Sequence, residues 1–244
     1  MTILRRKKSR LALIAAVPLL FLTGALLPET PAPAKKEQRE DGEFLILSAG
    51  RQIGTERFTL VLSEDTATST SALSFRNPAN VQQRIHIETR LEMNGRFTPL
   101  SYELKSDVDG QKGVILGKFS PNQAIFEYGS PEPSTRHGLL VGDQYTVLDT
   151  NVFHHFIFLA RLFLDGDTKK SRRLEVVIPQ ENEGGFLRIT ELDQETIPVR
   201  GKNAKCRRLR ADSGSLLIDL WVDDQRTLQK IAVPAREIVV VRND

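Results

Sequence analysis

Four histidines are the side chains best suited to bind a metal ion or to transfer a proton near neutral pH: His86, His137, His154 and His155. A zinc site needs three or four converging ligands, usually Cys, His or carboxylate side chains at short, regular spacing. Neighbouring residues of a helix point about 100° apart, so His154 and His155 do not reach one ion together. Cys206 is the only cysteine, and no carboxylate cluster stands at ligand spacing. We therefore predict no metal site, and we expect the histidines at a rim or at a helix end.

Motifs for catalysis or cofactor binding do not occur in the sequence. The chain has no Gly-x-Ser-x-Gly elbow, no His-Glu-x-x-His, no Walker loop and no Rossmann fingerprint. The pair Asp223-Asp224 stands between two strand-like runs, where a turn explains it better than a pair of catalytic acids. We predict no catalytic residues and no cofactor, and a hydrolase is the third alternative for the function.

Basic side chains are concentrated in one strand-like stretch, where Arg207, Arg208 and Arg210 lie close together. A second basic group lies within residues 169–173. Guanidinium and ammonium groups at such positions could contact lipid phosphates beside a membrane. The alternative is a solvated sheet face whose positive charges are balanced by nearby acidic residues.

A segment rich in phenylalanine, residues 151–164, interrupts the strand-like patterns. Capping residues at 149–151 and Gly166 just past the end favour a helix of about three to four turns. The segment is apolar almost all round, so we expect it inside the concave side of a sheet and not in water. Its side chains either line a cavity for a lipid tail or another apolar ligand, or they fill the core. The side chains expected to line the cavity are Phe153, Phe156, Leu159 and Phe163.

Through the rest of residues 35–244, apolar and polar residues alternate along the chain, which is typical of strands with one buried face. Phe58–Leu62 is one such run. Asn94-Gly95 and Asp109-Gly110 separate successive runs, and both dipeptides favour tight hairpin turns. Residues 129–142, which include two prolines, are expected to form a loop. The pattern predicts a mainly β fold, a strongly curved antiparallel meander of about 10–12 strands that forms a half-barrel with the apolar helix packed in its concave side.

The first 34 residues have the layout of an export signal. Residues 5–10 hold five basic groups, and an uncharged apolar run follows from Leu11 to Leu27. The run is at the lower edge of the length that spans a bilayer roughly 30 Å thick. Basic residues ahead of an apolar run stay on the cytoplasmic side. We expect the rest of the chain in the periplasm, either tethered to the inner membrane by residues 11–27 or released by cleavage after Ala34.

The net charge of +3 comes from this N-terminal segment. Residues 1–34 carry five basic groups and one acidic group, so residues 35–244 keep 29 basic and 30 acidic groups. That balance removes the general electrostatic argument for nucleic-acid binding. One cysteine excludes an internal disulfide, and about 210 residues suffice to bury a core of their own. We predict a single β-rich domain over residues 35–244.

Three short motifs follow one another along this domain. Gly50–Phe58 ends in Gly-Thr-Glu-x-Phe, Val147–Asp149 precedes the aromatic segment, and a Leu-Trp-x-Asp turn at 220–223 is followed by Val233-Pro234. In this order they resemble a broad group of bacterial periplasmic domains of unknown function that are similar to the lipoprotein carriers LolA and LolB. The resemblance implies a half-barrel whose curved sheet wraps an apolar cavity plugged by helix. The chain departs from the carriers in having one clear helix and no lipobox cysteine.

These observations predict an exported, non-enzymatic half-barrel that binds or carries an apolar or amphipathic, lipid-like component of the cell envelope. The alternative is a non-catalytic scaffold or interaction domain with a filled core, which acts through its surface in an envelope assembly. The expected partners are a lipid-like ligand and the inner membrane, and not nucleic acid. No feature of the sequence specifies an oligomeric state.

Overall fold

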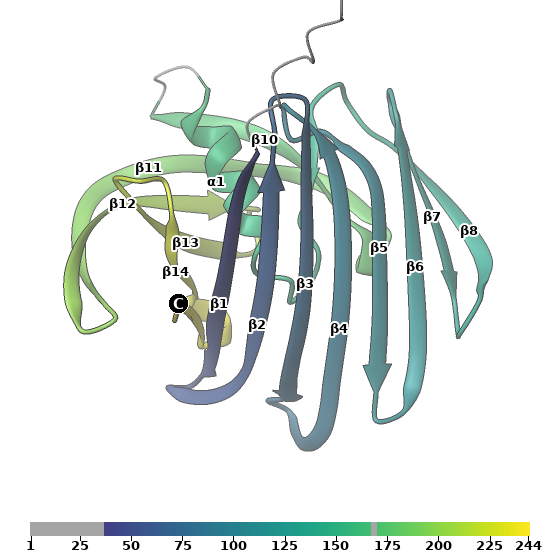
Figure 1. The fold of residues 1–244 in the computed structure, drawn as a ribbon, viewed down its shortest axis with the longest axis horizontal. Coiled ribbons are helices and arrows are strands. Elements are labelled where there is room, and N and C mark those ends of the chain that lie inside the picture. Colours follow the sequence, from purple (N-terminus) through teal and green to yellow (C-terminus); the bar gives the residue numbers. More distant parts are fainter. Residues whose placement is uncertain (1–36, 167–169) are drawn as a thin grey trace, which may run out of the picture. The chain divides into compact units, whose positions relative to one another are not determined.

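The computed structural model describes residues 37–166 and 170–244, which form one curved sheet with a single α-helix against it (Figure 1). The predicted N-terminal segment, residues 1–34, lies outside the described residues. Fifteen strands follow one another in the sheet, in the order β8-β7-β6-β5-β4-β3-β2-β1-β15-β14-β13-β12-β11-β10-β9. The end strands β8 and β9 do not pair with each other, so the sheet does not close into a barrel. The predicted mainly β fold with one helix is confirmed.

The first half of the sheet is a meander in which each strand pairs antiparallel with the next one along the chain. Alternate side chains of its strands are buried, as the period-2 pattern predicts. The strands are β1 (Gln38–Ser48), β2 (Arg51–Leu62), β3 (Thr66–Asn77), β4 (Asn80–Asn94), β5 (Pro99–Val108), β6 (Gln111–Ser120), β7 (Gln123–Gly129) and β8 (Pro133–Leu140).

The second half continues the sheet from β1, because the last strand of the chain pairs antiparallel with the first. Among the described strands only β9 and β10 pair in parallel. The elements are β9 (Tyr145–Val147), α1 (His155–Leu164), β10 (Ser171–Ile178), the short 3-10 helix η1 (Pro179–Glu181), β11 (Glu183–Val199), β12 (Lys202–Asp212), β13 (Leu217–Asp223), β14 (Leu228–Val233), the 3-10 helix η2 (Pro234–Arg236) and β15 (Ile238–Arg242).

Two predicted turns have different outcomes. Asp109-Gly110 forms a tight turn between β5 and β6, with φ of 53° and 89°. The prediction for Asn94-Gly95 is wrong in detail, since the residue with positive φ in that loop is Phe97, at 59°. The loop is longer than a two-residue turn because the side-chain oxygen of Asn94 accepts two backbone N–H groups of the loop and stabilises it.

The prediction of a loop over residues 129–142 is wrong, because this segment contains β8. The strand is exposed along most of its length, so it lacks the alternation by which a half-buried strand is recognised. Pro133 is its first residue, a position that a proline tolerates in an edge strand. The described residues form fifteen strands instead of the predicted 10–12 or so. The difference comes from β8, from the short β9 and from the separate strands of the hairpins in the second half.

The helix begins four residues later than predicted, at His155 instead of Asn151. Asn151 has a positive φ of 62°, which belongs to a turn and not to a right-handed helix. The predicted N-caps at 149–151 do not cap α1; its N-cap residue is His154, which makes no side-chain capping hydrogen bond. A carboxylate from β2, that of Glu56, instead accepts the backbone N–H groups of Phe153 and His154 at the start of the helix.

Helix α1 is packed inside the fold, as its apolar composition predicts. In Figure 1 it lies behind β1 and β2, on the side of β10–β14. The ring of Phe158 lies 5.7 Å from that of Phe97, in the loop between β4 and β5, and the helix contacts β9, β13 and β14 of the second half. Its buried residues are His155, Phe156, Ile157, Phe158, Leu159, Ala160, Leu162 and Phe163. The helix therefore fills the space between the two halves of the sheet.

Candidate functional site

A buried polar cluster stands where the chain enters α1, in the middle of an otherwise apolar core. Six side chains form it, and each has a relative exposure of 3% or less. We call it the helix-start cluster, and its members are Glu56, Ser69, Tyr102, Asp149, His154 and His155. Three strands of the first half of the sheet, the segment before α1 and the first residue of α1 supply them.

Glu56 is the centre of this cluster. It lies on β2 and shares the inner face of the sheet with Phe58, so the strand pattern turns its carboxylate into the core. One oxygen accepts the backbone N–H groups of Phe153 and His154, at 2.9 and 3.1 Å. The other lies 2.6 Å from Nδ1 of His154. The carboxylate thus satisfies N–H groups that a helix start leaves unpaired, and it does so from a strand about 100 positions earlier.

His154 links Glu56 to a serine. Its Nε2 lies 3.3 Å from Oγ of Ser69 on β3, and the ring of Phe58 stacks on it at 5.9 Å. Serine, histidine and carboxylate in this order are the arrangement of a nucleophile, a base and an orienting acid. All three side chains are fully buried, however, and no described pocket reaches Ser69. The arrangement therefore supports the start of the helix.

Asp149 is the second acidic member of the cluster. Its carboxylate accepts a hydrogen bond from the hydroxyl of Tyr102 at 2.7 Å, and it also accepts the backbone N–H groups of Thr150 and Gln180, both at 2.9 Å. Its own N–H donates to Nδ1 of His155 at 3.3 Å. Asp149 therefore joins β5, the turn before α1 and η1 at one point.

Burial shifts the pKa values of this group in a consistent way. The loss of water raises the pKa of Asp149 to about 6, against the opposing effect of the Tyr102 hydrogen bond. It also raises the pKa of Tyr102, and the charge of Asp149 adds to that increase. Burial lowers the pKa of His155 well below its ordinary value, with His154 as a second cause. His155 is therefore neutral, with an unprotonated Nδ1 that accepts the hydrogen bond from Asp149.

Of the two positions predicted for the histidines, a rim or a helix end, His154 and His155 occupy the second, because they lie at the start of α1. His154 and His155 have no exposed surface. Glu56 is the polar partner of His154, and the backbone N–H of Asp149 donates to Nδ1 of His155, whereas Nε2 of His155 is buried without a hydrogen-bond partner among the described residues. His86 and His137 are exposed on strands β4 and β8. Within residues 37–166 and 170–244, no group of three or more His, Cys, Asp or Glu residues is placed to hold a metal ion.

The helix-start cluster was not predicted from the sequence, although two sequence motifs contain members of it. The motif that ends in Gly-Thr-Glu-x-Phe contains Glu56, and the Val-Leu-Asp motif contains Asp149. Side chains alternate between the two faces of β2, so Glu56 lies on the same face as Phe58 and its carboxylate is expected in the core. A buried carboxylate needs hydrogen-bond donors, and the two histidines of the apolar segment were the available candidates.

The four side chains predicted to line an apolar cavity are all buried, with exposures of 0–8%. A cavity of about 30 Å³ touches one of them, Phe153, and its other lining residues are Ile46, Ile53, Phe75, Pro78, Asn151 and Ile238. Phe156, Leu159 and Phe163 instead belong to the continuous apolar core. The structure brings the four residues together as packed side chains around α1.

The three arginines predicted to contact an anionic surface all pair with carboxylates of the same sheet. Arg207 makes two hydrogen bonds to Glu191, at 2.7 and 2.8 Å. Arg208 and Arg210 both bind Asp219, with closest distances of 2.6 and 2.8 Å. Their positive charges are therefore balanced locally, which corresponds to the alternative given for this stretch.

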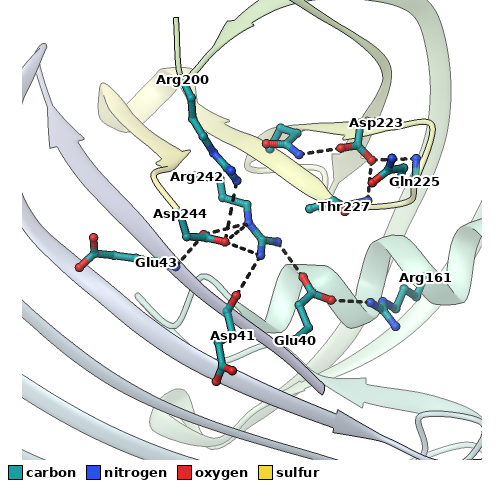
Figure 2. Close-up of polar contacts among 11 residues, drawn as sticks. Glu40, Asp41, Glu43, Arg161, Arg200, Asp223, Gln225, Thr227, Arg242 and Asp244 are labelled. Carbon is teal, nitrogen blue, oxygen red and sulfur yellow. Dashed lines mark hydrogen bonds and ion pairs between the residues drawn. The ribbon is translucent and has the colours of Figure 1, made fainter. Parts of the chain in front are cut away.

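A buried arginine connects the two halves of the sheet at the pairing of β1 with β15. Arg242 on β15 contacts Glu40 on β1 at 2.7 Å and Asp244 at 2.9 Å, and its side chain is 4% exposed. Glu40 in turn binds Arg161 of α1 at 2.8 Å. Figure 2 shows this chain of ion pairs, which runs from the C-terminus through Arg242 and Glu40 to the helix. It joins both halves of the sheet to α1.

The Asp223-Asp224 pair lies at a turn, as predicted. Asp223 is the last residue of β13, and its carboxylate accepts the backbone N–H groups of Gln225 and Thr227, each at 2.9 Å (Figure 2). The other oxygen accepts from the side chain of Gln229 at 2.6 Å. The side chain of Asp223 is thus used to shape the loop between β13 and β14.

Comparison with known proteins supports the fold and gives no function. No protein-family model and no curated protein matches the sequence. A crystal structure of a beta-barrel-like protein of the domain of unknown function DUF1849 from Brucella abortus is similar, with a TM-score of 0.56 and 11% identity. The similarity covers 86% of this chain and 95% of that one. At this identity the likeness establishes a shared beta-barrel-like fold.

A crystal structure of a DUF1089 family protein from Pseudomonas aeruginosa is a weaker match, with a TM-score of 0.45, 13% identity, and coverage of 74% of this chain and 90% of that one. The DUF1849 protein is described as beta-barrel-like and of unknown function, and not as a lipoprotein carrier. The similarity to LolA and LolB therefore stays an expectation from the sequence motifs. No helix within the described residues is long and apolar enough to cross a membrane.

Proposed function

We propose that this protein is a non-catalytic interaction domain with a filled core, which acts through its outer surface in an assembly of the cell envelope. The occupied concave side of the sheet is the observation that carries this proposal. Ligand pockets usually measure about 300–1,000 Å³. The cavity beside α1 measures about 30 Å³, and the side chains of α1 occupy the rest of the space.

Binding or transport of an apolar, lipid-like molecule is the second candidate function. Its support is the position of the small cavity, which is lined mainly by apolar side chains and lies next to the turn before α1. A lipid tail would enter there only if the turn and Phe153 moved outward. Such a movement would break the two hydrogen bonds that Glu56 makes to the backbone of the turn.

The place of action is also part of the proposal. A basic segment followed by an uncharged run at residues 11–27 supports export and a tether to the inner membrane. Cleavage after Ala34 would instead release the domain into the periplasm. Fractionation of cells, followed by N-terminal sequencing of the protein, separates these outcomes: a mature start at Lys35 would exclude the tether.

Native mass spectrometry of the full chain, gently extracted from the cells that produce it, tests the filled core. We expect the mass of the polypeptide alone. A stoichiometric lipid adduct that survives mild activation would contradict the interaction-domain proposal and support the second candidate.

A further inference from the structure

The two edges of the sheet are protected very differently. At one edge, β9 has three residues, all of them buried. At the other edge, β8 has eight residues, and the five from Ser134 to Gly138 are consecutively exposed. Figure 1 shows β8 at the end of the sheet, with β7 on one side and no described strand on the other. An edge of this length is a template for a further strand.

The backbone of β8 has hydrogen-bonding groups available on its open side. The N–H of Val141 donates to the carbonyl oxygen of Asn122 at 3.2 Å. In this register, every second residue counted back from Val141 directs its backbone groups towards β7. In an antiparallel pair, alternate residues direct their N–H and C=O groups to the neighbouring strand. Arg136, Gly138 and Leu140 therefore direct theirs away from β7.

The side chains of β8 give this edge a chemical preference. Leu140 is 89% exposed, and Arg136 is exposed without an ion pair to any described residue. Both lie on the outer face of the sheet, four residues apart. A hollow of about 290 Å³ lies beside Arg136, lined also by Glu127 and the first three residues of β8. The strand itself has Arg136 and His137 and no acidic residue.

We propose that β8 binds an extended segment of a partner protein as a sixteenth strand, with a carboxylate side chain of the partner opposite Arg136 and an apolar side chain against Leu140. This inference rests on the proposed interaction function and names its docking edge. Main-chain hydrogen bonds would give such a contact its affinity, and alternate side chains would give it specificity.

A second copy of this chain fits the edge less well. Antiparallel pairing of two β8 strands centred on Arg136 places the two Arg136 side chains opposite each other, and β8 has no acidic residue to balance them. Like charges facing one another across strands are destabilising. A partner strand with a carboxylate removes this repulsion and pairs with the unpaired arginine.

The test uses the full chain and two capped, threonine-rich peptides that differ at one position. In the first peptide an isoleucine precedes a glutamate by four residues, which places the two side chains opposite Leu140 and Arg136 in an antiparallel pair. The second peptide has lysine in place of the glutamate. Binding is measured by fluorescence anisotropy, and the site is located by amide hydrogen exchange. We expect at least tenfold tighter binding of the glutamate peptide, with slower exchange at Arg136, Gly138 and Leu140.

Three variants control this experiment. Arg136→Glu should reverse the preference between the two peptides. Gly138→Pro removes an N–H group on the open side while leaving the pairing with β7, and it should weaken binding at least tenfold with little change in Tm. Gly138→Ala keeps the N–H group, and its added Cβ meets atoms only at 3.6 Å or beyond, so it should bind like the wild type.

Three results would overturn the inference. The first is equal binding of both peptides, and the second is the absence of any protection of β8 amides. The third is a dimer, seen by analytical ultracentrifugation, that Gly138→Pro dissociates, since this would assign the edge to a second copy. If the peptides do not bind β8 and the protein carries no lipid, β8 is not the interface, but the proposed interaction function is not contradicted. A lipid adduct would contradict that function regardless of the peptide results.

Discussion

At the scale of single residues, Glu56 decides how the helix is held. Its carboxylate is fully buried and has three polar contacts, all with residues 153 and 154. A charge in such a position is tolerated only when its partners are complete. Removal of the carboxylate leaves two backbone N–H groups and a histidine without their acceptor.

We expect Glu56→Ala to lower the free energy of unfolding by roughly 3–5 kcal/mol, because it breaks a buried polar pair and leaves its partners unsatisfied. Chemical denaturation followed by circular dichroism measures the change. Glu88→Ala is the matched control, since Glu88 is an exposed glutamate whose contact with His86 should contribute about 0–1 kcal/mol. Equal losses in the two variants would refute the role of Glu56.

The second prediction at this scale concerns pH. The folded-state pKa of Asp149 is about 6, above its ordinary 3.8, so the folded protein binds this proton more tightly than the unfolded chain does. The stabilisation from Asp149 is therefore complete below about pH 4 and is lost as the pH rises through 6. Relative to Asp149→Asn, the wild type should lose up to about 3 kcal/mol of stability over this interval.

His155 should show the opposite dependence. Its folded-state pKa is lowered by burial, so its contribution to stability is present above its ordinary value of 6.5 and falls as the unfolded chain takes up the proton below it. Denaturation curves of the wild type, Asp149→Asn and His155→Gln at a series of pH values measure both effects. Parallel pH profiles of all three proteins would show that neither group titrates differently in the folded and unfolded states.

At the scale of elements, the joint between β1 and β15 depends on one buried arginine. Arg242 is 4% exposed and binds carboxylates from β1 and from the C-terminal residue, while Glu40 extends the contact to α1. The two sheet halves and the helix are therefore joined through this ionic connection. Its loss should affect all three elements at once.

We expect Arg242→Met to destabilise the fold by roughly 3 kcal/mol, because Glu40 then loses one of its two arginine partners inside the protein. Arg57→Met is the matched control: Arg57 is 80% exposed on β2, and its pair with Glu43 should contribute about 0–1 kcal/mol. Urea titrations of both variants give the comparison. An Arg242→Met protein as stable as the control would show that the joint does not need this side chain.

The sequence was informative about elements wherever one face of a strand is buried. Period-2 runs such as Phe58–Leu62 predicted strands correctly, and the apolar segment predicted a helix inside the sheet. β8 was missed because both of its faces are exposed, so no alternation marks it. The start of α1 was misplaced because Glu56, far away in sequence, supplies the cap that local residues were expected to give. Contacts between distant residues formed the helix-start cluster, and local patterns do not contain them.

At the scale of the whole molecule, the concave side of the sheet is already occupied by α1. Leu159 is fully buried in α1 and belongs to the continuous core. Leu159→Ala should cost about 2–5 kcal/mol, as for other large-to-small changes in packed cores. If α1 were instead a loosely held plug, the same change would cost much less. The thermal unfolding midpoint of the variant, compared with that of the wild type, measures the difference.

Titration of the wild-type full chain with a dansylated fatty acid tests whether the core is filled, since the dye brightens when it enters an apolar site. We expect no saturable increase in fluorescence, because a cavity of about 30 Å³ does not hold an acyl chain. Phe153→Ala serves as a control that enlarges the cavity without opening the rest of the core. Saturable one-to-one binding by the wild type, weakened by Phe156→Ala and Phe163→Ala together, would contradict the filled core and establish a ligand site around α1.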